Sequence, residues 1–187
     1  LELMRLNVER ADYLMQNFKK ILVSQLKNER ELFDISEAIE ETIRLVIVSL
    51  KRGQVQVKYH KKLAPEQRIW MGCRGFLSQV VINLLTNVER YAYPNGVGGI
   101  VDVTIRMDDD VYYHLIVKDH GKGIPMQDQA HVFEPLFTTG QSIGGTGLGL
   151  AIVHNLVTNS LNGEIKLKSE DGKGTEFIVV FPRVILE

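Results

Sequence analysis

The sequence predicts an α+β fold, a two-layer α/β sandwich preceded by a long N-terminal helix. Three observations predict it. Residues 3–27 contain no glycine or proline and carry apolar residues at heptad spacing, which is typical of a long helix. Alternating polar and apolar residues predict two hairpins, at 100–118 and 164–181. Apolar residues at helical spacing predict three further helices, and a sheet that packs against helices on one face forms two layers.

The N-terminal segment carries one apolar stripe, with apolar residues alternately four and three positions apart: Met4, Val8, Ala11, Met15, Phe18 and Leu22. Such a helix needs a partner for this stripe, most simply in a symmetric dimer or bundle. Packing against the chain's own globular part is the alternative. We therefore expect two units, a helical segment at residues 1–30 and a globular domain at residues 31–187.

The sequence at residues 32–59, at the start of the globular part, predicts a strand, then a helix, then a second strand. Residues 32–35 are a short strand, and Ser36 is expected to cap the helix that follows it. Gly53 is expected to end that helix as a left-handed cap. Alternation at residues 55–59 predicts the next strand.

A third helix follows Gly75, and two asparagines interrupt its apolar pattern. Asn83 and Asn87 lie one helical turn apart, so both side chains share one face. The first hairpin comes next and finishes at Asp119. Residues 125–146 have no regular period and predict a long loop, a length usually reserved for a functional lid.

Residues 140–149 are rich in glycine and lead into a helix that begins at Gly147. A helix N-terminus presents unpaired N–H groups and the positive end of the helix dipole, which favours phosphate. A flexible linker followed by a cap is the alternative. The spacing matches neither the dinucleotide fingerprint nor the P-loop, so other parts of the chain must contribute to any nucleotide site.

Composition excludes several classes of function. The 187 residues carry a formal net charge of −1, which gives no long-range field for DNA, RNA or an anionic membrane. The single cysteine, Cys73, excludes an internal disulfide and a cysteine-cluster zinc site. It also suits a reducing compartment, and we expect a cytoplasmic domain, whether or not the parent protein is membrane-tethered.

Four separated clusters contain polar residues or glycines that suit nucleotide chemistry: Asn83 with Asn87, Asp119 to Ile124, His131 to Thr139, and Gly145 to Leu150. In these clusters the sequence resembles the ATP-binding catalytic domain of sensor histidine kinases. That superfamily also contains type II topoisomerases, the heat-shock chaperone ATPase and mismatch-repair ATPases. The clusters resemble its N, G1, F and G2 boxes, in the same order, and the resemblance covers residues 32–182. It implies the Bergerat-type ATP-binding fold.

The resemblance implies the roles of the first cluster. Asn87 would bind Mg²⁺ through its amide oxygen, a hard donor, with water and phosphate oxygens completing the coordination. Asn83 would support it, with a helix-face hydrogen bond as the alternative role. Arg90 and Tyr91 match a basic and an aromatic position that contact phosphate and cover the nucleotide.

The second cluster would recognise adenine. Asp119 would accept a hydrogen bond from the adenine amino group, a contact that guanine cannot make. Gly121 and Gly123 would let the backbone approach the base, and Ile124 would pack on it. Thr175 matches a threonine that reaches adenine through water.

The remaining ATP-binding positions that the resemblance implies lie in the loop and in the glycine-rich segment: Thr138, Thr139, Gly145, Thr146, Gly147, Leu148 and Gly149. Family members often carry a basic residue directly after the two threonines, but here that position is Gly140, and residues 125–146 contain no lysine or arginine. Arg90 and Lys122 would then meet the phosphate charge together with Mg²⁺. We expect weaker affinity or a more mobile lid. His120 replaces a common asparagine and is either a pH-sensitive neighbour or passive.

The resemblance implies a kinase that transfers the γ-phosphoryl group of ATP to a histidine. In the family that the sequence resembles, the acceptor histidine is followed by an acidic residue and lies on the first helix of a dimerisation hairpin, but none of the five histidines here is followed by one. Residues 1–30 resemble the second helix of that hairpin, which would be incomplete, so we expect the acceptor outside this sequence. Implied partners are that hairpin, a response regulator and a second copy of the parent, but no nucleic acid. A regulatory nucleotide-binding module acting on a partner kinase is the alternative, and a hydrolytic ATPase is a third.

Overall fold

A computed structural model describes residues 29–140 and 145–183. A five-stranded sheet forms one layer, with the strand order β2-β4-β5-β7-β6. Strands β2 and β4 run parallel, and every other neighbouring pair runs antiparallel. The strands are β2 Val55–Lys62, β4 Gly99–Met107, β5 Tyr112–Asp119, β6 Glu164–Glu170 and β7 Gly174–Pro182. Both predicted hairpins are confirmed, β4–β5 and β6–β7.

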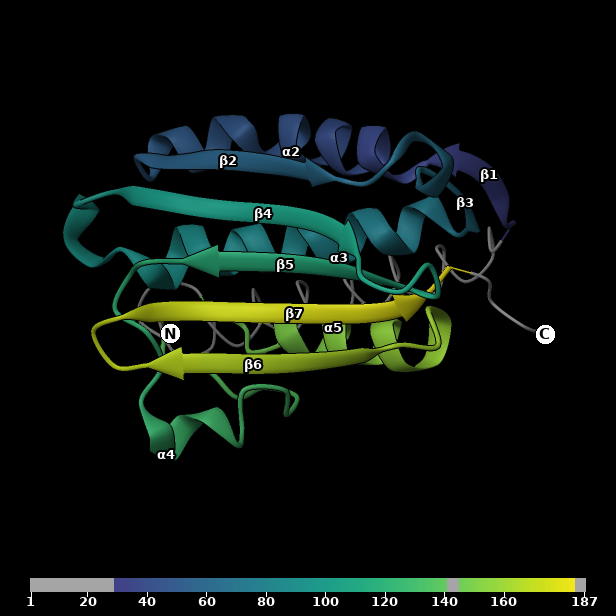
Figure 1. The fold of residues 1–187 in the computed structure, drawn as a ribbon. Coiled ribbons are helices and arrows are strands. Elements are labelled where there is room, and N and C mark those ends of the chain that lie inside the picture. Colours follow the sequence, from purple (N-terminus) through teal and green to yellow (C-terminus); the bar gives the residue numbers. More distant parts are fainter. Residues whose placement is uncertain (1–28, 141–144, 184–187) are drawn as a thin grey trace, which may run out of the picture.

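Three helices cover one face of this sheet, as Figure 1 shows. They are α2 Ile35–Arg52, α3 Arg74–Asn87 and α5 Gly149–Asn155. Helix α3 lies between the other two and packs against both. Helices α3 and α5 each continue into a π-helical turn, Val88–Ala92 and Leu156–Ser160. The predicted two-layer sandwich is therefore confirmed.

The core lies between the two layers. Inward residues alternate along the strands, as in Val101, Val103 and Ile105 of β4, which are fully buried. From the helices, Leu84 and Leu85 of α3 are fully buried against them. Burial of a leucine side chain contributes about 1.5–3 kcal/mol, so this interface provides much of the domain's stability.

A second, two-stranded sheet was only half predicted. Strand β1, Glu31–Asp34, matches the expected strand, but its partner β3, Ile69–Gly72, was missed. Only Trp70 and Gly72 of β3 face inward, and four residues are too few for alternation to stand out. Trp70 is fully buried, with its ring 5.2 Å from that of Phe181.

Two predicted helix caps are wrong. Asp34, not Ser36, caps α2, because its carboxylate accepts hydrogen bonds from the N–H groups of Ser36 and Glu37. The helix does end before Gly53, but Gly53 has φ −77°, and the left-handed residue is Gln54, at φ 56°.

The predicted N-terminal helix lies outside the described residues. Among the helices that the structure describes, none combines the length and apolarity needed to cross a membrane. The described residues of the predicted lid, 125–140 and 145–146, contain one short helix, α4 Met126–Gln129. In the chain the lid lies between β5 and α5, and its Thr138 contacts Tyr91, just after the C-terminal end of α3.

Candidate nucleotide site

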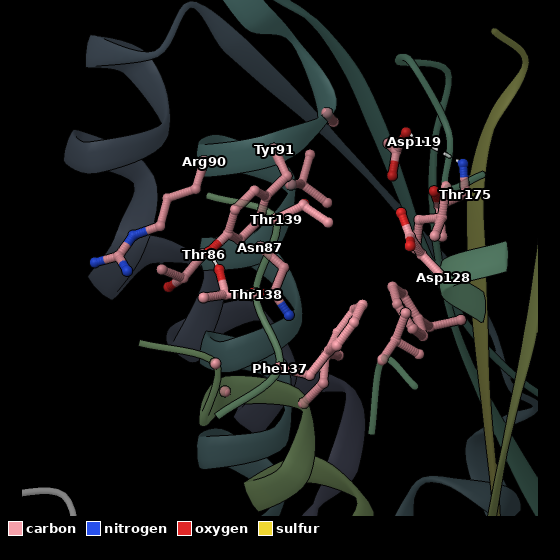
Figure 2. Close-up of a pocket in the computed structure, with 18 of the residues that line it drawn as sticks. Thr86, Asn87, Arg90, Tyr91, Asp119, Asp128, Phe137, Thr138, Thr139 and Thr175 are labelled. Atoms are coloured by element: carbon pink, nitrogen blue, oxygen red, sulfur yellow. Dashed lines mark hydrogen bonds between the residues drawn. The ribbon is translucent and has the colours of Figure 1, made fainter. Parts of the chain in front are cut away.

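One cavity of about 220 Å³ lies between the end of α3, the end of β5 and the lid. Residues that are far apart in the sequence line it. Figure 2 shows Asn87 and Tyr91 on one side of the space and Asp119, Thr175 and Asp128 on the other. The four clusters identified in the sequence therefore contribute residues to one cavity, as a shared nucleotide site requires.

Most of the predicted site residues line this cavity. They are Asn83, Asn87, Arg90, Tyr91, Asp119, Lys122, Gly123, Ile124, Thr138, Thr139, Thr146, Gly147, Gly149 and Thr175. Gly121, Gly145 and Leu148 do not line it. Nine further lining residues were not named individually as site residues, although Val132, Phe137 and Leu150 lie within the predicted clusters: Thr86, Val88, Ala92, Pro125, Asp128, Val132, Phe137, Leu150 and Phe177. Most of these are apolar, and nothing in their sequence pattern separates a cavity wall from an ordinary core.

Asp119 is the buried carboxylate of the cavity. It is 5% exposed, and its Oδ1 accepts hydrogen bonds from the N–H groups of Gly121 at 2.9 Å and Thr175 at 3.2 Å. Burial raises the pKa of the Asp119 carboxyl above its ordinary value, and the two N–H donors only partly offset this effect. Because both bonds end on Oδ1, Oδ2 is the oxygen available to a ligand.

The glycines beside Asp119 are required by packing. A Cβ on Gly121 would lie 2.1 Å from the carbonyl oxygen of Ala92, which also accepts a hydrogen bond from Lys122 N–H at 2.8 Å. Gly123 has φ +71°, and a Cβ there would lie 2.1 Å from the carbonyl oxygen of Glu170. This loop is therefore held between the end of the α3 segment and the β6–β7 hairpin.

On the side of the cavity opposite Asp119, the side-chain amides of Asn83 and Asn87 each bury a nitrogen atom that is unpaired within the described residues. In the described part of the chain, the Nδ2 atoms of both residues have no hydrogen-bond partner. Asn83 Oδ1 accepts a hydrogen bond from Gln79 Nε2 at 3.0 Å, so the helix-face role weighed for Asn83 is observed. Unpaired buried amide groups cost about 1–3 kcal/mol each, a cost that a ligand with oxygen atoms would remove.

The donor set around Asn87 fits Mg²⁺ only together with a phosphate ligand. Among the described residues, no group of three or more His, Cys, Asp and Glu side chains is placed to hold a metal ion. A neutral amide oxygen is a suitable single protein ligand for Mg²⁺, which commonly keeps water and substrate phosphate as its other ligands. The cavity therefore suits a magnesium–nucleotide complex better than a free ion.

The lid is fastened to the cavity by a few hydrogen bonds. Tyr91 Oη lies 3.3 Å from Thr138 Oγ1, which also accepts a hydrogen bond from Gly140 N–H at 3.0 Å. Farther along, Leu136 N–H donates to the carbonyl oxygen of Gly147 at 2.8 Å. Leu136 and Gly147 both have φ +69°, so two left-handed residues meet where the lid reaches the start of α5.

Two predicted phosphate contacts find less support. In Figure 2 the Arg90 guanidinium points away from the space between Asn87 and Asp119. Helix α5 begins at Gly149, two residues later than predicted, and is only seven residues long before its π-helical turn. The glycine-rich segment therefore approaches the cavity mainly as a loop, through Thr146, Gly147 and Gly149.

His120 faces away from the cavity. Its Nε2 lies 3.0 Å from Asp102 Oδ2, while His60 Nε2 lies 2.7 Å from Asp102 Oδ1. Partial burial opposes ionisation of Asp102, but the hydrogen bonds from the two imidazoles prevail and lower the pKa of its carboxyl. This cluster joins β2, β4 and the residue directly after Asp119.

Comparison with known proteins supports a nucleotide site. The model of a family described as histidine kinase-, DNA gyrase B- and HSP90-like ATPases matches residues 72–185. The histidine-protein kinase/phosphatase MprB of Mycolicibacterium paratuberculosis is 34% identical over 157 residues, which are 81% of this chain. The sensor histidine kinase RcsC of Escherichia coli is 31% identical over 171 residues, 89% of this chain.

The chain spans only 28% of the length of that MprB protein and 17% of that of RcsC. A solved structure of a mycobacterial sensor histidine kinase MprB is also similar, with a TM-score of 0.65 and 29% sequence identity. That likeness covers 82% of this chain and 97% of the solved chain. Sequence and fold therefore agree on the same class of domain.

Proposed function

The chain belongs to the family of histidine kinase-, DNA gyrase B- and HSP90-like ATPases, as a domain of the histidine kinase type, and we propose that it binds ATP with Mg²⁺ and transfers the γ-phosphoryl group to a histidine on another segment. The convergence of Asp119, Thr175 and Asn87 on one cavity carries this proposal. Phosphoryl transfer asks little covalent chemistry of the protein, so positioning and charge stabilisation are its main tasks.

Adenine is proposed to bind at the Asp119 end. The ionised carboxylate accepts a hydrogen bond from the 6-amino group through Oδ2, while Gly121 and Thr175 hold Oδ1 in place. Ile124, Val132 and Phe177 offer apolar surface to the faces of the base. Burial of the carboxylate strengthens this contact, because water competes less there.

The phosphates are proposed to lie toward Asn87. Its amide oxygen holds Mg²⁺, which supplies charge neutralisation for the phosphates when bound. Asn83, Tyr91, Lys122, Thr138 and Thr139 line the same space and offer hydrogen-bond donors to phosphate oxygens. The N–H groups of the loop at residues 146–149, with Leu148 among them, add further donors. Gly145 allows Tyr91 and Thr138 to approach closely, since a Cβ there would lie 2.2 Å from Tyr91 Oη.

The acceptor histidine is proposed to lie on a dimerisation hairpin. Residues 1–30 are proposed to be the second helix of that hairpin, and residues 31–187 to be the catalytic domain. The heptad stripe at residues 4–22 supports this division, as does the absence of an acidic residue after each of the five histidines. A homodimer through that hairpin and a response regulator as the next phosphate acceptor follow from the proposal. We place the domain in the cytoplasm, where ATP is available.

Phosphate transfer to a separate hairpin tests this function. The chain is mixed with radiolabelled ATP, Mg²⁺ and a purified hairpin that carries a His-Glu or His-Asp pair from a kinase of this family. Label on the histidine supports the proposal, and a hairpin variant with His→Gln is the control. If ATP binds tightly but no such hairpin becomes labelled, the proposed kinase activity is contradicted.

A non-catalytic regulatory module is the second candidate, and the composition of the lid favours it. Residues 125–146 contain no lysine or arginine, so the lid offers no cationic side chain to the γ-phosphate. Tight binding without transfer is its signature. Steady ATP hydrolysis by the chain alone would instead favour the chaperone or topoisomerase branch.

A further inference from the structure

The hydroxyl of Ser169 lies behind Thr175 and joins three segments of the chain. It accepts a hydrogen bond from Ile124 N–H at 2.8 Å and donates one to the carbonyl oxygen of Gly174 at 2.9 Å. It also lies 3.1 Å from Thr175 Oγ1, and the two residues face each other across β6 and β7. Ser169 does not line the cavity, but Ile124 and Thr175 do.

The protons in this cluster can be assigned from its geometry. A serine hydroxyl has one proton and two lone pairs. The carbonyl oxygen of Gly174 can only accept, so the Ser169 proton points there. Ile124 N–H occupies one lone pair of Ser169 Oγ, and the other remains for Thr175. The proton between the two hydroxyls therefore belongs to Thr175.

This assignment fixes what Thr175 presents to the cavity. With its proton directed at Ser169, the Thr175 hydroxyl faces the cavity with lone pairs only. Asp119 lies beside it, held by Thr175 N–H at 3.2 Å, and an ionised carboxylate also only accepts. The base-recognition end of the cavity thus offers two adjacent acceptors, as Figure 2 shows for the two labelled side chains.

We propose that Ser169 is a positioning residue that holds the Thr175 hydroxyl as an acceptor and so favours purines with a 6-amino group over purines with a 6-oxo group. The amino group donates to these acceptors directly, whereas a 6-oxo group meets them with further lone pairs. This inference rests on the proposed binding of ATP.

Binding of ADP and inosine diphosphate tests it, because the two ligands differ only at the 6-position and the adjoining ring nitrogen. Dissociation constants for both are measured by calorimetry with Mg²⁺ on the whole 187-residue chain. In Ser169→Ala the Thr175 proton loses its acceptor and can turn toward the cavity. The preference for ADP over inosine diphosphate is expected to fall about tenfold, which corresponds to one hydrogen bond.

Two variants separate this role from a structural one. Ser169→Thr keeps the hydroxyl and is expected to keep the wild-type preference. Gln129 is the matched control, because its Nε2 donates to the carbonyl oxygens of Ile124 at 2.8 Å and Ser169 at 3.0 Å without affecting the Thr175 proton. Gln129→Leu is expected to weaken both nucleotides equally and leave the preference unchanged.

Three results would overturn the inference: an unchanged preference in Ser169→Ala, an equal loss for both nucleotides in that variant, or no preference in the wild type. If circular dichroism shows that Ser169→Ala does not fold, Ser169→Cys, whose thiol is a weak acceptor, carries the same test with a smaller expected change. Failure of the wild type to bind ADP at all contradicts the proposed function instead.

Discussion

The N–H of Thr175 donates a hydrogen bond to Asp119 Oδ1 at 3.2 Å, although 56 positions separate the two residues in the sequence. Both are buried at the same end of the cavity. The contact exists because β5 and β7 are neighbours in the sheet, with Lys118 paired to Glu176 directly beside it. Sheet topology, rather than a continuous motif, therefore builds the end of the site that we assign to the base.

Asp119→Asn is predicted to stabilise the free protein at neutral pH. Burial raises the pKa of the Asp119 carboxyl above its ordinary value of 3.8, so the folded protein holds this proton more tightly than the unfolded chain does. The resulting stability is fully present below the unfolded pKa and is lost as pH rises through the folded pKa. Asparagine does not ionise, so the variant avoids this loss.

Thermal unfolding of wild type and Asp119→Asn from neutral pH down to about pH 4 measures this effect. The variant is expected to have the higher Tm at neutral pH, and the two Tm values are expected to converge as the pH falls. If the wild type is the more stable protein at neutral pH, the buried Asp119 carboxylate does not cost the fold stability, and the prediction is contradicted.

Asp102→Asn is predicted to destabilise the protein modestly. Its carboxylate pairs with His60 and His120, and because these side chains are partly exposed, the loss is expected to be at most about 1 kcal/mol. Hydrogen bonds to the imidazoles outweigh burial and lower the pKa of Asp102, so this stability is present above the unfolded pKa, near 3.8, and is lost as pH falls through the folded pKa.

Denaturant unfolding at several pH values measures the difference between Asp102→Asn and wild type. It should shrink below about pH 5, where the Asp102 carboxyl of the wild type becomes protonated. Two lysines on the neighbouring strands are in register with Asp102, Lys58 on β2 and Lys118 on β5. A difference that grows below about pH 5 contradicts the assignment.

Gly147→Ala is predicted to weaken nucleotide binding about tenfold or more, since the residue must keep φ +69° and its new Cβ would lie 2.3 Å from the backbone of Leu136. The expected result is a displaced lid, measured as a larger dissociation constant for MgADP. Gly172→Ala is the matched control, because Gly172 has φ +78° but open space around it.

In Gly172→Ala the strain alone is expected to cost about 1 kcal/mol of unfolding free energy and to leave nucleotide affinity unchanged. Equal affinities for Gly147→Ala and Gly172→Ala would mean that contact between Gly147 and the lid plays no part in binding.

Thr138→Val is predicted to speed nucleotide release. The substitution keeps the shape of the side chain but removes the oxygen that accepts from Gly140 N–H and contacts Tyr91 Oη. Losing about 1 kcal/mol of lid contact corresponds to a dissociation rate about fivefold higher, which stopped-flow release of a fluorescent ADP analogue measures. Thr158→Val, which removes a hydroxyl bonded only within its own helical segment, is the control. Equal release rates in the two variants would contradict a fastened lid.

Much of the fold was predictable because its long elements have clear periods. Strands β4 and β6 alternate between apolar and polar residues, and α2 and α3 carry apolar stripes long enough to be distinct. The errors lie where one residue decides the outcome. Asp34 and Ser36 are both good caps, and only the structure shows that β1 ends at Asp34 and that α2 begins directly after it.

The site was predictable where a polar residue stands in an apolar pattern, as with Asn83, Asn87 and Asp119. Apolar lining residues such as Val88 and Phe177 were missed, because their pattern is that of any core residue. Asp128 was missed because nothing in the sequence distinguishes an acidic residue in a predicted loop, although in the structure it lies on α4 and is partly buried. The bonds of Ser169 depend on the pairing of β6 with β7 and on a loop that crosses behind it, neither of which a local pattern contains.

Calorimetric titration of MgADP into wild type, Asp119→Asn and Asp102→Asn tests the central claim most directly. Both variants replace a carboxylate with an amide near the end of a neighbouring strand, but only Asp119 lines the cavity. The account predicts binding by wild type and Asp102→Asn with similar affinity, and a loss of about 100-fold or more in Asp119→Asn. Wild-type affinity in Asp119→Asn would contradict it.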